Sequence, residues 1–151
     1  MIWRIKLLKN NFGEFLISGS NNSLILHKFA ENNLILKLKY NNNIPNKLIF
    51  DIEIINKNIF ITCCENLIKI WNYLYTNPIY IIDNIFKSTI YSIKYLEQFS
   101  NQNEKIIFFG DSEKKFYVFK FYINEKIILD KLGEFNKEDE IYKIINLFNC
   151  K

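Results

Sequence analysis

Apolar residues occur along the chain in short runs that polar turns separate, and one four-residue pattern precedes several of these runs. The pattern is isoleucine, aromatic residue, polar residue, isoleucine, and it occurs at residues 2–5, 49–52, 90–93 and 141–144. The aromatic residue alternates with the isoleucines, so we expect the two types to face opposite sides of a strand. The spacing of 41 to 51 residues indicates a repeated unit of several strands.

Each of the first three tetrads is followed by two apolar runs that flank a polar turn, which predicts a β-hairpin. The paired runs are residues 15–18 with 24–27, 59–63 with 67–71, and 105–110 with 116–119. A fourth run completes each unit, at residues 34–40, 79–82 and 126–131. No stretch has the pattern of a capped amphipathic helix, so the sequence predicts an all-β chain.

The composition supports a folded β-protein. Hydrophobic residues make up 49% of the 151 residues and aromatic residues 17%, which is unlike a disordered chain. Isoleucine, phenylalanine and tyrosine dominate, and Ala30 is the only alanine, which favours strands over helices. The length is that of a single domain with its own core.

The formal charge of +4 is spread along the chain in interspersed signs. One local excess of lysines lies in the third unit beside two tyrosines: Lys114, Lys115, Lys120, Lys126 and Lys131, with Tyr117 and Tyr122. Such a stripe is one way to hold RNA phosphates. Because acidic residues are interleaved with these lysines, we favour a solvated sheet face and treat RNA as the weaker alternative.

The residues that carry catalysis or bind metals are few. Cys63, Cys64 and Cys150 have no zinc-site spacing, and their odd number argues against a disulfide framework. We expect Cys63 and Cys64 to be small buried residues. His27 is the only histidine, so any serine or cysteine triad would need it. We expect no catalytic residue, metal, cofactor or small-molecule substrate.

The N-terminal residues form no signal-peptide core, and no uninterrupted apolar run approaches the roughly 18 residues of a membrane span. We therefore expect a protein of the cytoplasm or nucleus with no membrane contact.

The repeated unit resembles the repeat of WD40 β-propeller proteins. In that family a small residue closes the second strand, a turn follows, and the third strand ends in Trp-Asp. The corresponding stretches here are residues 18–28, 62–72 and 109–120. Trp71-Asn72 is similar to the signature dipeptide, and His27 and Phe119 occupy the equivalent positions of the other two units.

The resemblance implies one partial WD40-like β-propeller domain over residues 1–151. Its three four-stranded antiparallel blades span about 1–43, 47–84 and 88–133, and the first strand of a fourth spans about 140–149. The residues expected to define the blades, all in structural roles, are Trp3, His27, Phe50, Trp71, Asn72, Tyr91, Phe119 and Tyr142. The tetrad aromatics among them are expected to pack between neighbouring blades.

Three blades and one strand do not close a ring, so apolar blade faces would be left open. The chain is then a fragment of a longer propeller, a subunit whose ring a partner completes, or half of a homodimeric ring. The resemblance implies a non-catalytic protein-interaction scaffold, a subunit of a multiprotein complex. The alternative is an accessory role in tRNA modification or in diphthamide-type modification of a translation factor, because residues 3–6, 49–52 and 63–67 are also similar to a propeller of the diphthamide pathway.

Overall fold

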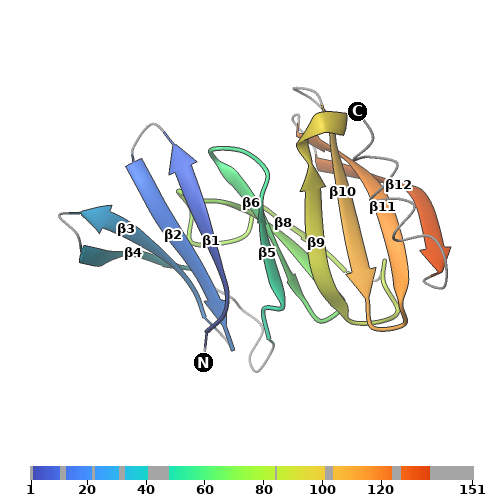
Figure 1. The fold of residues 1–151 in the computed structure, drawn as a ribbon, viewed down its shortest axis with the longest axis horizontal. Coiled ribbons are helices and arrows are strands. Elements are labelled where there is room, and N and C mark those ends of the chain that lie inside the picture. Colours follow the sequence, from blue (N-terminus) through green and yellow to red (C-terminus); the bar gives the residue numbers. More distant parts are fainter. Residues whose placement is uncertain are drawn as a thin grey trace.

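Antiparallel pairing follows chain order in three separate groups of strands (Figure 1). The computed structural model describes residues 2–10, 13–21, 23–30, 33–40, 48–83, 85–100, 104–123 and 127–136. Sheet 1 contains β1 (Ile2–Asn10), β2 (Gly13–Ser20), β3 (Leu24–Ala30) and β4 (Asn33–Tyr40). Sheet 2 contains β5 (Asp51–Ile54), β6 (Ile59–Cys64), β7 (Leu67–Asn72) and β8 (Tyr80–Ile82). Sheet 3 contains β9 (Ile90–Leu96), β10 (Glu104–Asp111), β11 (Lys115–Ile123) and β12 (Ile127–Asn136), with a short 3-10 turn at Glu97–Phe99.

The prediction of an all-β chain with three four-stranded antiparallel sheets is confirmed. Each sheet is open, and each is a simple meander of four consecutive strands. The predicted first strand of a fourth unit, at about 140–149, lies outside the described residues. Among the described residues, no helix has the length and apolar character that crossing a membrane requires.

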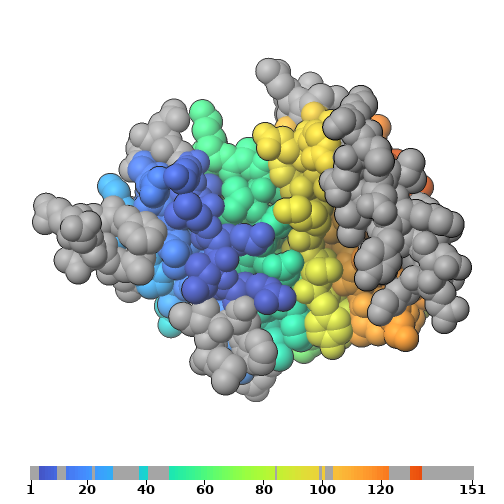
Figure 2. Space-filling view, viewed as in Figure 1, coloured from blue at the N-terminus to red at the C-terminus, as the bar shows by residue number. Residues whose placement is uncertain are grey.

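The three sheets stand side by side, with sheet 2 in the middle (Figure 1). Their first strands are neighbours, because β5 contacts both β1 and β9. Figure 2 shows atoms of the three sheets forming one continuous surface, from blue through green to yellow. The first strand of each sheet therefore lies at a shared inner edge.

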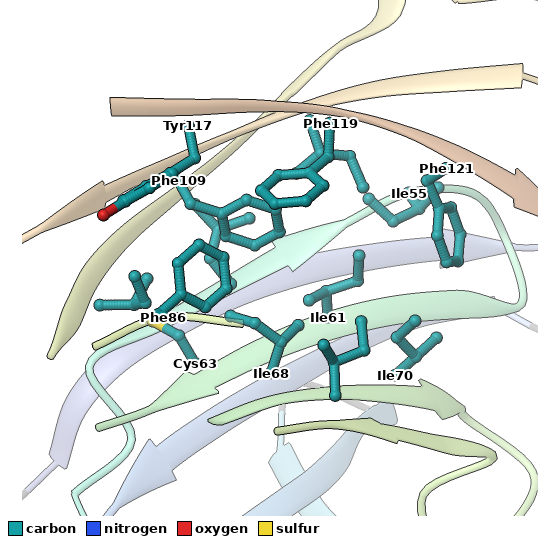
Figure 3. Close-up of a cluster of buried hydrophobic side chains, with 14 of the residues drawn as sticks. Ile55, Ile61, Cys63, Ile68, Ile70, Phe86, Phe109, Tyr117, Phe119 and Phe121 are labelled. Atoms are coloured by element: carbon teal, nitrogen blue, oxygen red, sulfur yellow. The ribbon is translucent and has the colours of Figure 1, made fainter. Parts of the chain in front are cut away.

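Sheet 2 is covered on both faces. One core lies between sheets 1 and 2 and includes Phe15, Ile17, Phe60 and Trp71. A second core lies between sheets 2 and 3, where aromatic rings of sheet 3 pack over isoleucines of sheet 2 (Figure 3). Every residue of β6 is buried, as expected for a strand covered from both sides.

Sheets 1 and 2 approach closely at Gly19. A Cβ atom added there would lie 2.9 Å from Cγ2 of Ile49 and 3.1 Å from Cδ1 of Ile52. These distances are shorter than an ordinary carbon contact. Glycine at this position is therefore required by the spacing of the two sheets.

Each of the three tetrads that the structure describes contains a β-bulge at its aromatic residue. The register of β1 against β2 skips Trp3, and the register of β9 against β10 skips Tyr91. In sheet 2 the N–H of Phe50 donates to the carbonyl of Cys63 at 3.0 Å, and Asp51 pairs with that same residue. Two residues of the first strand thus oppose one residue of the second strand in all three sheets.

The bulge changes the meaning of the tetrad. In a regular strand the first and fourth residues face opposite sides, so plain alternation would expose one isoleucine of each pair. The extra residue brings both isoleucines to the same face, and Ile49, Ile52, Ile90 and Ile93 are all at most 3% exposed. Alternation in a regular strand therefore does not explain why both isoleucines of a tetrad are buried. The bulge does.

Candidate functional site

Charged side chains line the inner edge where the three first strands meet. One and three positions after the tetrad's aromatic residue, β1 carries two basic residues and β5 carries two acidic residues. The later of these two positions is a lysine in β9. These residues are Arg4 and Lys6, Asp51 and Glu53, and Lys94. We call this set the charge ladder.

Glu53 is the centre of the charge ladder. Its side chain is only 7% exposed, and its Oε2 lies 2.7 Å from Nζ of Lys6. Its Oε1 accepts a hydrogen bond from the N–H of Tyr95 at 3.0 Å and lies 3.4 Å from Nζ of Lys94. A buried carboxylate on β5 therefore joins sheet 1 to sheet 3 through charge-assisted contacts.

Asp51 repeats this arrangement two residues earlier. Its Oδ1 lies 3.4 Å from Nε of Arg4 and also accepts a hydrogen bond from the N–H of Ile52. Its Oδ2 accepts a hydrogen bond from the N–H of Ile93 at 2.9 Å. The two carboxylates thereby satisfy N–H groups on the unpaired edge of β9, the edge that faces away from β10.

The sequence patterns did not single out Asp51 and Glu53. The available signal is their place one and three residues after the tetrad's aromatic residue, with basic residues at the equivalent places in β1. The ladder therefore has a structural explanation: it binds three sheets at one edge.

The signature residues of the third strands occupy equivalent positions. Trp71 is fully buried, and its Nε1 donates to Oγ1 of Thr62 at 2.9 Å. Its ring stacks on Phe60, with the planes 6° apart and the centroids at 6.0 Å. Phe119 lies in the second core at 1% exposure. Both rings belong to the sheet face that is turned toward the preceding sheet.

His27 has the corresponding place in sheet 1. Its Nε2 lies 3.4 Å from Oγ of Ser18, as Nε1 of Trp71 lies close to Thr62. His27 itself is only half-buried, because this face of sheet 1 is turned away from sheet 2. Ser18 is only 4% exposed, so its hydroxyl is not accessible to a substrate as a nucleophile would have to be. The Ser18–His27 contact is therefore a packing contact.

The tetrad aromatics are less uniform than expected. Phe50 and Tyr91 pack edge to face between sheets 2 and 3, with ring centroids 4.8 Å apart. Tyr91 is nevertheless 46% exposed, so only part of this ring packs against its neighbours. The side chain of Trp3 and all of Tyr142 lie outside the described residues.

Asn72 ends β7 by starting a turn. Its Oδ1 accepts a hydrogen bond from the N–H of Leu74 at 3.0 Å, which is the local geometry that asparagine favours after a strand. Asn72 is thus placed as a turn residue beside Trp71 and makes no contact with the charge ladder that the structure records.

The two neighbouring thiols of β6 are fully buried. Burial and the nearby charge of Asp51 raise the pKa of the Cys63 thiol well above its usual range. A thiol in that state is a poor nucleophile. Within the described ranges no group of three or more histidine, cysteine, aspartate or glutamate side chains is arranged to hold a metal ion.

The lysine stripe of the third unit is divided between two faces. Tyr117 is 6% exposed and lies in the second core, so it offers no ring for stacking with a base. Lys120 lies 3.5 Å from Glu104, whose charge raises the pKa of that lysine. Lys126 lies outside the described residues. Lys120 lies over the ring of Tyr122 and Lys131 over that of Tyr117, with Nζ 5.9 and 5.0 Å from the ring centroids. The two tyrosines have opposite parity in β11, so these pairs do not form one continuous stripe.

Asp111 organises the turn between β10 and β11. Its Oδ1 accepts hydrogen bonds from the N–H groups of Glu113 and Lys115 at 2.9 and 2.8 Å. Its Oδ2 accepts from the hydroxyls of Ser88 and, at 3.0 Å, Tyr117. Partial burial alone would raise the pKa of Asp111, but these hydrogen bonds outweigh it and hold the pKa below its usual value.

Comparison with known proteins adds no relative. The chain matches no protein-family model, and a search of curated proteins found no significant match.

Proposed function

We propose that the chain is a non-catalytic protein-interaction scaffold whose three sheets are blades of a WD40-like β-propeller. The observation that carries the proposal is the repetition of one local structure. In all three sheets the first strand has a bulge at the tetrad's aromatic residue and lies at the shared inner edge. Blades of a propeller are meanders that share an inner edge in this manner.

The third strands support the same proposal. His27, Trp71 and Phe119 have equivalent places in their third strands. The rings of Trp71 and Phe119 face the preceding sheet, and His27 lies on the face of sheet 1 that is turned away from sheet 2. Repeats that stack in one direction bury the same position at each interface. Such a stack is a rigid support for other molecules.

A protein partner is favoured by what the surface presents. Large apolar side chains are exposed on β1 and around β8, among them Ile5, Leu7, Leu74, Tyr80 and Ile81. Contiguous exposed apolar residues mark protein interfaces more often than nucleic-acid sites, which are basic and polar. The accessory role in RNA modification is less well supported because Tyr117 is buried and Lys120 is paired with Glu104.

The test is to purify the tagged chain from its source cells, with and without nuclease, at low and high salt. We expect a protein partner in fixed stoichiometry that survives nuclease and high salt. Binding that nuclease abolishes and that falls steeply with salt would replace the scaffold with an RNA-binding function. Recovery of the chain with no partner in fixed stoichiometry would also refute the proposal.

A further inference from the structure

One face of sheet 1 is apolar and uncovered by the described residues. Ile5 and Leu7 of β1 are 53% and 47% exposed. Ile5 is the last residue of its tetrad. The last residues of the next two tetrads, Ile52 in β5 and Ile93 in β9, are 0% and 3% exposed. What buries Ile52 is sheet 1, and what buries Ile93 is sheet 2.

We call the face of sheet 1 that carries Ile5 and Leu7 the open face. The interfaces between sheets 1 and 2 and between sheets 2 and 3 show how the equivalent faces of the other two sheets are covered. In each of them the tetrad isoleucines and the third-strand ring pack against the preceding four-stranded sheet. The third-strand rings Trp71 and Phe119 are buried in this way, whereas His27 is half-exposed. The open face has the form of a surface that receives another sheet.

Polar contacts at the inner edge specify the chemistry of that sheet. The N–H groups of Ile93 and Tyr95 donate hydrogen bonds to the carboxylates of Asp51 and Glu53, respectively. In β1 the equivalent N–H groups belong to Ile5 and Leu7, and among the described residues no carboxylate reaches them. A sheet that repeats the interface between sheets 2 and 3 would bring two carboxylates to these two groups.

The charges alternate in the same direction. Lys6 contacts Glu53, and Glu53 contacts Lys94, so basic, acidic and basic side chains follow one another across the three sheets. A strand placed before β1 would set its own side chain beside Lys6. An acidic residue there continues the alternation, and a basic residue would place like charges opposite one another.

We propose that the open face of sheet 1 docks a β-sheet of a different protein, whose inner strand carries carboxylates at two alternate positions. The proposal rests on the scaffold function above and names the chemistry of its partner. A second copy of this chain is a poor occupant. The face of sheet 3 that is turned away from sheet 2 presents Ser92 and Lys94 at the places of Asp51 and Glu53, so Lys94 would meet Lys6.

The test gives a second copy the charges that the face requires. The double variant Ser92→Asp/Lys94→Glu reproduces in β9 the acidic pair of β5. The matched control Ser112→Asp/Lys114→Glu makes the same two changes at exposed positions in the turn after β10. Self-association is measured by sedimentation velocity over a range of concentrations, and circular dichroism checks that each variant retains its sheets.

We expect the double variant to self-associate at least about tenfold more tightly than wild type and control, which is the effect of one charge-assisted hydrogen bond. Because the new glutamate would lie near Glu53, Ser92→Asp/Lys94→Gln serves as a second variant without that repulsion. Failure of both folded variants to associate more tightly than the control would overturn the proposal. Equal association of the wild-type chain would overturn it too, because a second copy would then suffice.

The natural partner gives an independent readout. Leu7→Glu places a negative charge on the open face, and we expect it to lower partner recovery at least about tenfold. Leu132→Glu, at a leucine of β12 that is 55% exposed, is the control and should leave recovery unchanged. If Leu7→Glu leaves recovery unchanged, the scaffold function stands and the docking face is refuted. If wild type recovers no partner, the scaffold function fails, while the sedimentation result still decides the chemistry of the face.

Discussion

Replacing Glu53 with glutamine tests whether the charge ladder holds the sheets together. The substitution keeps the shape of the side chain and an oxygen that accepts the N–H of Tyr95. It removes the charge shared with Lys6 and Lys94 and sets an NH2 group against Nζ of Lys6. Donor then faces donor at a site where the carboxylate is almost fully buried.

The magnitude follows from the exposure of each partner. Breaking a fully buried ion pair costs about 3–5 kcal/mol because one charge is left without a partner. Here Lys6 is 35% and Lys94 68% exposed, so both ammonium groups can turn to water. The loss is then closer to that of a hydrogen bond to a charged group, and we expect Glu53→Gln to lower the free energy of unfolding by about 2–3 kcal/mol.

Equilibrium unfolding in urea measures this loss as a shift in midpoint at unchanged slope. The matched control is Glu14→Gln, because Glu14 pairs with Lys9 at 2.5 Å but both side chains are more than half exposed. That pair is worth about 0–1 kcal/mol. A Glu53→Gln effect within about 0.5 kcal/mol of the control would show that the ladder does not stabilise the fold.

Four further substitutions probe other parts of the structure. The hydroxyl of Tyr73 is buried without a hydrogen-bond partner, so Tyr73→Phe should leave stability unchanged or raise it by up to about 1 kcal/mol. Tyr40→Phe loses a 3.0 Å bond to the carbonyl of Tyr73 and should lower stability by about 1 kcal/mol in the same urea assay. The lowered pKa of Asp111 means that its carboxylate stabilises the fold above the pKa of an unfolded aspartate, about 3.9, and that this contribution is lost as pH falls through the lower folded pKa. Asp111→Asn should therefore cost about 1–3 kcal/mol at pH 7, and the melting temperatures of the two proteins should converge as pH falls through that folded pKa; a constant gap would contradict the assignment. Gly19→Ala forces a methyl group against Ile49 and should cost about 1–3 kcal/mol, which an unchanged urea midpoint would refute.

The strands were predictable because apolar periodicity and turn residues act locally. The runs at 59–63 and 67–71 lie within β6 and β7, whose connection is the two-residue turn at Glu65, where φ is 56°. The last strand was predicted too short, at 126–131 instead of Ile127–Asn136. Its pairing with β11 skips Leu132, so a bulge interrupts the alternation from which the strand was inferred.

The division of the lysine stripe was also within reach of the sequence. Tyr117, Phe119 and Phe121 alternate along β11, and all three lie in the second core. Lys120 and Tyr122 have the opposite parity and therefore share the other face. The prediction grouped the tyrosines by nearness in sequence, which a strand does not preserve.

The charge ladder was not predictable in the same way, because its contacts join residues 41 to 47 positions apart. Which acidic residue meets which lysine depends on how the sheets stand next to one another, and periodicity within a strand carries no information about that. The repeat supplies the missing step once the tetrads are superimposed. Arg4 and Lys6 then fall at the places of Asp51 and Glu53, so neighbouring first strands bear opposite charges.

Opposite charges at these places also bear on the order of the sheets. The apolar faces of the three sheets are built from the same few residue types, so hydrophobic packing alone discriminates weakly between one neighbour and another. A buried carboxylate discriminates strongly, because Glu53 without Lys6 and the N–H of Tyr95 would be a buried charge with too few partners. Sheet 2 therefore accepts a basic first strand before it and a free strand edge after it. The charge ladder therefore favours this order of the three sheets over any other order. A buried ion pair contributes specificity in this way even where its net stabilisation is small.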